Sequence, residues 1–184
     1  LLRLPGVLEP TEPALDGKAY RAPAKRALAQ ALEALQAMRG KEGGNLKRDL
    51  AKRLGELKRV AKRVAKRAPA VLKQHRRRLI ERLRKVGIET PAADDERLLR
   101  EMVYYTDRMD ITEELTRLDS HFGQLEQCLR STQPVGRKLD FLAQEMFREI
   151  NTIGSKANDS TISGEVVTLK TELEKIREQV QNVE

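Results

Sequence analysis

Reactive side chains are concentrated in residues 135–156, VGRKLDFLAQEMFREINTIGSK. Read as a helix, this segment places Glu145 and Glu149 one turn apart, in a row beside its apolar stripe. Because two such carboxylates repel each other, a cation should compensate them, and either an arginine or a divalent metal ion can do so. Ordinary interface salt bridges are the alternative explanation. A second polar row follows the same helix: Asp140, Gln144, Arg148 and Asn151.

An earlier segment repeats this plan. Asp110, Glu114, Arg117 and His121 form a polar row at the margin of an apolar stripe. Histidine with Asp and Glu one turn away is how metal sites and acid–base pairs are built. A lone histidine on a helix is more often a hydrogen-bonded interface residue, so both interpretations stay open for His121.

The elements that carry these rows must be long amphipathic helices. The 184 residues include no tryptophan, three tyrosines and three phenylalanines, and 35% of them are charged. Such a chain can bury a core only where helices pack along their length. We therefore predict an all-α fold, an extended helical bundle with a coiled-coil-like arm, assembled as an oligomer.

The positions of glycine and proline predict three parts of the chain: an extended lead-in at 1–23, a helical and strongly basic arm at 24–90, and a C-terminal helical domain at 91–184. In the arm, Gly40, Gly43 and Gly44 should weaken or interrupt the helix, and Pro69 should kink it or begin a new segment. In the C-terminal domain, Thr90 and Pro91 should start a helix that runs to about 129. The expected turns before and after the next helix are 131–134 and 154–164.

Charge is strongly segregated within the formal net charge of +8. Residues 46–85 hold 17 Lys and Arg against 3 Asp and Glu, a balance of +14, whereas residues 91–184 hold 12 against 19. The basic helix fits nucleic-acid phosphate best, with a solvated face and a membrane surface as alternatives. Without interleaved aromatic rings, it favours recognition of the phosphate backbone over the bases. His75, among arginines, is expected to be a plain surface residue.

Several classes of protein are excluded by what the sequence lacks. It has no Gly-rich phosphate loop, no Ser-His-Asp order and no cysteine zinc pattern. The single Cys128 cannot form an internal disulfide and suits a reducing compartment. With no apolar run of membrane-spanning length and no signal peptide, we expect a cytoplasmic protein with no membrane partner. The start at Leu1, without methionine, suggests a piece of a longer protein.

Three motifs resemble those of the YicC/YloC family of bacterial endoribonucleases: EELTRLDSH at 113–121, the segment 135–156, and IREQVQN at 176–182. The resemblance is dense over residues 91–184 and thins upstream to Leu4-Pro5-Gly6-Val7. It implies a metal-dependent nuclease that cuts single-stranded RNA internally and assembles from long helices as a homohexamer. It also implies a further N-terminal domain ahead of the Leu-Pro-Gly segment, which leaves open whether residues 1–184 cleave RNA alone. Two departures from the family pattern are the heavier basic excess and Gly44.

A mechanism follows as a hypothesis from the polar rows and this resemblance. Glu114, Glu145 and Glu149 would supply oxygen ligands to Mg²⁺ or Mn²⁺, with Asp110 or Asp140 as a further ligand. His121 would orient a water or move a proton. The residues expected to hold RNA phosphate are Arg117, Arg137, Arg148 and Lys156.

Three alternatives remain at this point. Cleavage could use the RNA 2′-hydroxyl with His121 as base and no metal. The chain could instead be a non-catalytic RNA-binding and assembly module that scaffolds a separate nuclease. Finally, the polar rows could only set the register of a structural coiled coil.

Overall fold

All regular structure in the described residues is helical, which confirms the prediction of an all-α fold. The computed structural model describes residues 17–85, 87, 96–181 and 183. The helices are α1 (Gly17–Lys85), α2 (Glu96–Met109), α3 (Thr112–Arg130), α4 (Gly136–Lys156) and α5 (Ser160–Val180). The chain divides into two units, Leu1–Asn45 and Leu46–Glu184, and α1 contributes to both.

In the first unit, the described part is the beginning of α1, and residues 20–45 are all exposed. The helix starts at Gly17, so the lead-in prediction is wrong for residues 17–23; residues 1–16 lie outside the described ranges. Pro23 removes a single backbone donor, and the intrahelical bonds on either side keep the helix intact. The predicted interruption at Gly40–Gly44 is also wrong, because each glycine costs a helix only about 1 kcal/mol.

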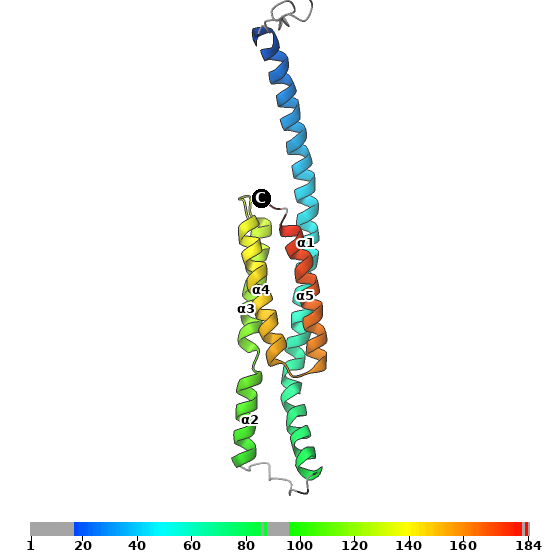
Figure 1. Cartoon of the computed structure of the whole chain (residues 1–184), viewed down its shortest axis with the longest axis vertical. Helices are drawn as coiled ribbons and strands as arrows, with labels where there is room; N and C mark the ends of the chain where they lie inside the picture. The colour runs from blue at the N-terminus through cyan, green and yellow to red at the C-terminus, as the bar shows by residue number, and fades with distance from the viewer. Residues whose placement is uncertain (1–16, 86, 88–95, 182, 184) are drawn as a thin grey trace, which may run out of the picture. The chain divides into compact units, whose positions relative to one another are not determined.

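The core of the second unit is built by the later part of α1 together with α3, α4 and α5 (Figure 1). On α1, the buried side chains recur at steps of four and three and so form one continuous stripe. Each of them contributes about 1.5–3 kcal/mol on burial. The stripe comprises Leu50, Leu54, Leu57, Val60, Val64 and Val71. It faces apolar stripes of the three other helices, including Leu118, Phe122, Leu142, Ile150, Leu169 and Leu173.

A close approach of α4 to α5 depends on Gly154. A Cβ atom at this residue would lie 3.1 Å from Cγ1 of Val166, tighter than an ordinary contact. The predicted turn at 154–164 is too long, because α4 continues to Lys156 and α5 begins at Ser160. Gly154 therefore lies inside α4, where the lack of a side chain lets the helix pack closely against Val166 of α5, and it does not end the helix.

The long helix predicted between residues 91 and 129 is two helices. α2 ends at Met109 and α3 begins at Thr112. At the break, the Asp110 carboxylate accepts a hydrogen bond from the Thr112 amide at 2.9 Å, a local bond that competes with helical hydrogen bonding. The predicted start at Thr90 and Pro91 lies outside the described residues.

Part of the basic excess of α1 is neutralised inside the fold. Lys58 bonds Glu126 of α3 at 2.6 Å, and Arg63 makes two bonds of 2.7 Å to Glu165 of α5. Arg53 reaches Glu172 of α5 at 3.4 Å. The segregation of charge along the sequence therefore becomes complementarity between neighbouring helices.

Asp159 joins α1 to the start of α5. Its carboxylate accepts from the Ile162 amide at 3.1 Å as the N-cap, and Arg67 donates to both of its oxygens, at 3.2 and 2.7 Å. These bonds, led by that of Arg67, hold the pKa of Asp159 below its usual value. A carboxyl whose pKa is depressed by folding stabilises the protein above its unfolded pKa, and the contribution is lost as the pH falls through the folded value.

We expect Asp159→Asn to lower the free energy of unfolding by about 1 kcal/mol at neutral pH. The loss should shrink as the pH falls below about 4, because the parent carboxyl then protonates in the unfolded chain and, at still lower pH, in the folded protein. Urea unfolding between neutral and acidic pH measures this difference. Asp119→Asn, at an exposed carboxylate on α3, is the control. An equal loss for Asp159→Asn across the whole pH range would contradict the assignment.

His75 is not the plain surface residue that was predicted. Because α1 continues through Pro69 without beginning a new segment, His75 reaches α2 and stacks on Tyr105, with ring centroids 3.3 Å apart and planes at 10°. Burial is the main cause that lowers the pKa of His75. Among the described helices, none combines the length and apolar character needed to cross a membrane.

Candidate functional site

Four of the predicted residues meet between α3 and α4. The Lys156 ammonium donates to Oε1 of Glu114 at 2.9 Å, and Nε of Arg117 donates to Oε1 of Glu149 at 2.8 Å. Arg117 also reaches Oε1 of Glu114 at 3.4 Å. Both main pairs join an early residue of α3 to a late residue of α4, so the two helices run antiparallel here. We call these four residues the α3–α4 charge cluster.

The two carboxylates of the cluster are buried, whereas its two cations are only partly covered. Glu114 is 2% exposed and Glu149 is 9% exposed. Arg117 and Lys156 keep 47% and 34% of their side chains exposed. The hydrogen bond to Glu149 raises the pKa of Arg117 above its usual value, so its charge is permanent. The cluster therefore presents two partly exposed cations, which two buried carboxylates hold in place.

Two buried polar atoms on α3 lack a hydrogen-bond partner among the described residues. They are Oε2 of Glu114 and Nδ1 of His121. Glu114 and His121 lie seven residues apart, two turns along α3. An unpaired buried acceptor is costly, so each atom marks a place where a proton, a water or a cation can bind.

The other predicted residues make separate local contacts. Glu145 accepts from Arg148 at 2.8 Å, and Asp140 accepts from Gln144 at 2.8 Å. Asp110 bonds Thr112, whose hydroxyl and amide hold the pKa of Asp110 below its usual value. Arg137 is exposed in the first turn of α4.

The predicted ligand set for a metal is not assembled within this chain. In the part of the chain that the structure describes, no three His, Cys, Asp or Glu side chains converge as a metal site requires. One oxygen each of Glu114 and Glu149 is already bonded to Lys156 or Arg117. The residues present therefore do not fit a complete metal site in a single copy, and we derive no chemical step through a metal.

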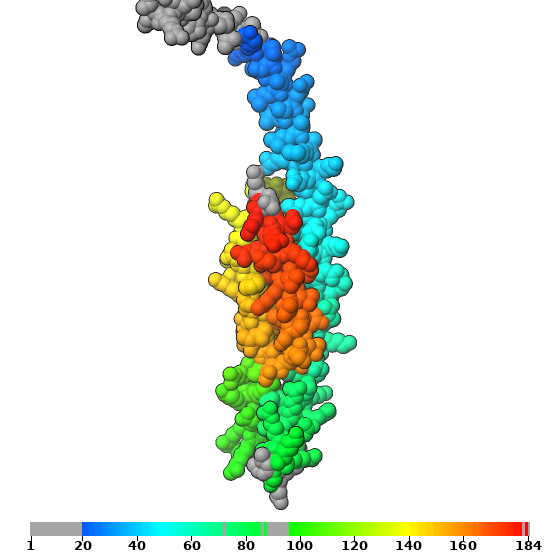
Figure 2. All heavy atoms as spheres, turned by 45° about the vertical axis from the view of Figure 1, so that its right-hand side comes forward, coloured from blue at the N-terminus to red at the C-terminus, as the bar shows by residue number. Residues whose placement is uncertain are grey.

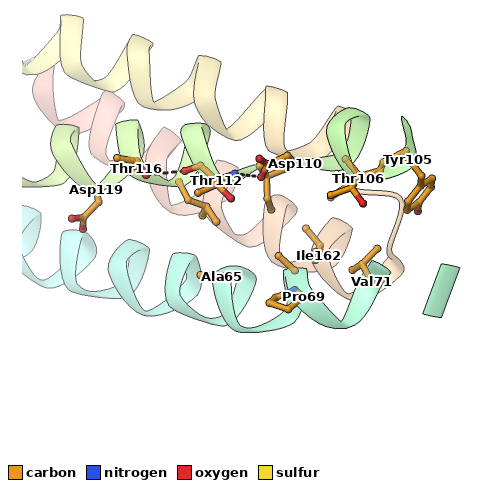
Figure 3. A pocket seen from close by; sticks show the side chains of 15 residues that line it. Ala65, Pro69, Val71, Tyr105, Thr106, Asp110, Thr112, Thr116, Asp119 and Ile162 are labelled. Atoms are coloured by element: carbon orange, nitrogen blue, oxygen red, sulfur yellow. Dashed lines mark hydrogen bonds between the residues drawn. The ribbon is translucent and has the colours of Figure 1, made fainter. Parts of the chain in front are cut away.

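A cavity of about 740 Å³ next to the α2–α3 break was not predicted. Figure 3 shows Ala65 and Pro69 of α1 opposite Thr112, Thr116 and Asp119 of α3. Small side chains on α1 leave the space that bulkier ones would fill. The sequence signal was the change from leucine to alanine along the α1 stripe, with Ala65 and Ala68 beside Pro69.

The helices that form this cluster lie in a region that matches a known protein family. The family model described as "Endoribonuclease YicC-like, C-terminal" matches residues 64–184. The chain belongs to the YicC-like family. The matched range contains all of α2 to α5 and the last third of α1.

Two curated YicC relatives extend the similarity towards the N-terminus. A protein of Clostridioides difficile is 43% identical over 159 residues, which is 86% of this chain and 54% of that protein. A protein of Haemophilus influenzae is 38% identical over 184 residues, which is all of this chain and 62% of that protein. Both are named "Probable endoribonuclease YicC". The chain therefore spans little more than half the length of these relatives.

Two of the three motif segments of the YicC-like chain meet in the fold. Residues 113–121 lie on α3, and residues 135–156 form α4 with the residue before it. The α3–α4 charge cluster is thus made only of motif residues. This agreement between motif and geometry makes it the candidate functional site.

Proposed function

We propose that this chain is the helical part of an endoribonuclease that cuts single-stranded RNA internally. The observation that carries the proposal is membership of the YicC-like family together with the convergence of its motif residues in the α3–α4 charge cluster. Arg117 and Lys156 keep enough exposure to meet a phosphodiester, and Glu114 and Glu149 hold them in place. His121 lies two turns further along α3, where it would move a proton.

The outer face of α1 supports a role in gathering RNA. Lys52, Arg59, Lys66 and Lys73 recur every seven residues on the side away from the apolar stripe, and all four are exposed. The basic residues beside the apolar stripe, such as Lys58 and Arg63, are paired with acids of α3 and α5. The four exposed residues lie on the opposite side of α1 and face solvent. Cations repeated on one face attract a polyanion through its backbone and release counterions on binding.

Metal dependence is a further part of the proposal. The ligands Glu114, Glu145 and Glu149, with Asp110 or Asp140, would need a second copy or another part of a longer protein to complete a Mg²⁺ or Mn²⁺ site. Self-association, as a hexamer, is proposed for the same reason. A cytoplasmic location is proposed because RNA is the substrate.

A cleavage assay tests the function. The 184-residue chain, with 5′-labelled single-stranded RNA, is expected to produce internal cuts in Mn²⁺ and none in chelator. Glu145→Gln with Glu149→Gln should lower the cleavage rate at least 100-fold, about 3 kcal/mol of transition-state stabilisation. A longer protein that also carries the additional N-terminal region of the relatives should be assayed in parallel, because cuts by it alone would place part of the active site outside residues 1–184.

The control is Glu101→Gln, which changes an exposed carboxylate of α2 outside the three motifs and should leave cleavage unchanged. Melting curves separate lost chemistry from lost folding. Cleavage that persists in the double variant would show that these carboxylates are not ligands. Equal RNA binding in Mn²⁺ and chelator, with no cuts by either protein, would favour the scaffold function, which the internal pairing of the cluster charges also supports.

A further inference from the structure

The outward face of α4 carries an unusual series of exposed side chains. Five residues recur at steps of four, three, four and three, so they form a single row away from the core: Arg137, Phe141, Gln144, Arg148 and Asn151. Phe147 lies next to this row, one turn from Gln144. Phe141 is 57% exposed and Phe147 is 37% exposed. Two phenyl rings left at the surface of a chain with only three phenylalanines call for a physical reason.

Helix α5 extends this surface. Figure 2 shows α4 (yellow to light orange) and α5 (orange to red) side by side along one face of the unit formed by residues 46–184. The Lys170 ammonium lies 5.7 Å from the centroid of the Phe147 ring, within range of a cation–π interaction. A shallow groove of about 370 Å³ between the helices is lined by Phe147, Arg148 and Arg177, among others.

The charge of this surface contrasts with its surroundings. Residues 91–184 carry 12 basic and 19 acidic residues, yet four of those basic residues border the two rings. These are Arg137, Arg148, Lys170 and Arg177. Three acids lie beside them: Glu145 pairs with Arg148 at 2.8 Å, Glu174 lies 4.0 Å from Arg177, and Asp140 accepts a hydrogen bond from the Gln144 amide. Four bases against three acids leave a small basic excess on this surface, in a half of the chain that is acidic as a whole.

We propose that the α4–α5 surface, with Phe141 and Phe147 as stacking platforms, binds the bases of single-stranded RNA. Exposed rings stack on any base, the arginines and Lys170 take the flanking phosphates, and Gln144 and Asn151 offer amide groups to base edges. Bases in a duplex are already stacked on one another, so the surface selects single strands. This inference rests on the proposed function and adds the place where the substrate is held.

The arrangement fits RNA better than a second copy of the chain. The rings are about 9 Å apart along the helix axis and are separated by polar or charged side chains, so they do not merge into one apolar patch. When an RNA base stacks on the Phe147 ring, it displaces the Lys170 ammonium from that ring. The ammonium then pairs with a phosphate of the RNA strand.

Anisotropy of a short fluorescein-labelled single-stranded RNA tests the proposal with the 184-residue chain. Each change, Phe141→Ala or Phe147→Ala, is expected to weaken binding roughly 5- to 150-fold. Val167→Ala removes a comparably exposed apolar side chain from α5 and should leave the affinity unchanged. Unchanged affinity in the double phenylalanine variant, with RNA still bound, would overturn this inference and leave the proposed function standing.

A second measurement uses the absence of tryptophan from the chain. Phe141→Trp introduces a single tryptophan, which can be excited selectively at wavelengths where the three tyrosines do not absorb. Its emission should be quenched by single-stranded RNA and not by an RNA duplex of the same length. Light scattering of the double alanine variant distinguishes a protein interface, because a fall in molar mass would show that this face joins copies of the chain and would overturn the proposal. If the parent chain binds no RNA at all, the proposed function fails with it.

Discussion

Replacing Phe122 by alanine is expected to remove about 3–5 kcal/mol from the free energy of unfolding. Phe122 lies on α3, is only 1% exposed, and belongs to the core that α1, α3, α4 and α5 build. Alanine would forfeit the transfer free energy of the ring and leave a cavity that long helices, anchored along their length, cannot close. Urea denaturation followed by circular dichroism measures the loss.

Phe141→Ala is the matched control, because it deletes the same ring from the exposed face of α4. A surface change of this kind should alter stability by no more than about 0.5 kcal/mol. Equal destabilisation by the two substitutions would mean that the outer face of α4 is covered in solution. It would therefore contradict both the assignment of the core and the use of Phe141 for RNA.

The packing of the second unit could be predicted because it follows from a single periodic signal. Apolar residues at steps of three and four in four segments predicted amphipathic helices, and the buried stripes of α1, α3, α4 and α5 are those segments. The periodic stripe from Leu46 to Val64 and that from Val166 to Val183 are buried, except for Leu46, Ala61 and Val183, which are partly buried against the same core. Periodicity marks the apolar face of a helix and does not say whether that face is covered: Leu28, Leu32, Leu35 and Met38 share one face of α1 and are all exposed.

Helix ends were predicted less well because glycine, proline and aspartate act only through their context. Gly40, Gly43 and Gly44 lie within α1, whereas Asp110, inside a strong helical pattern, ends α2 by bonding the Thr112 amide. The first case costs a helix a few kcal/mol at most and is tolerated. In the second case, the Asp110 carboxylate takes the place of a backbone carbonyl as the acceptor for the Thr112 amide. Hydrophobic periodicity carries no information about such a side-chain bond.

The candidate site was predictable in its residues but not in their pairing. The polar rows of α3 and α4 contain all four members of the charge cluster. Which members face each other depends on the register of two antiparallel helices, which the loop at 131–135 and the core side chains set together. For that reason Glu149 meets Arg117, while Glu145 and Asp140 bond neighbours on their own helix.

Lys156→Met is expected to destabilise the fold by about 3 kcal/mol, because it leaves the buried Glu114 carboxylate without its closest cation. Arg117 is the remaining cationic partner that bonds this carboxylate, at 3.4 Å, and Arg117 is also bonded to Glu149. The reverse change, Glu114→Gln, should cost only about 1 kcal/mol, because the Lys156 ammonium is partly exposed and can turn to water. Chemical denaturation of the two variants measures this asymmetry.

Lys138→Met, at an exposed lysine of the same helix, is the control and should be nearly neutral. The double variant Glu114→Leu with Lys156→Met should regain most of the lost stability, since an apolar pair of similar volume replaces a buried ion pair without its desolvation cost. If the double variant folds well yet no longer binds or cleaves RNA, the charges are retained for function rather than for stability. Equal losses from Lys156→Met and Glu114→Gln would instead show that the Glu114 carboxylate is hydrated in solution.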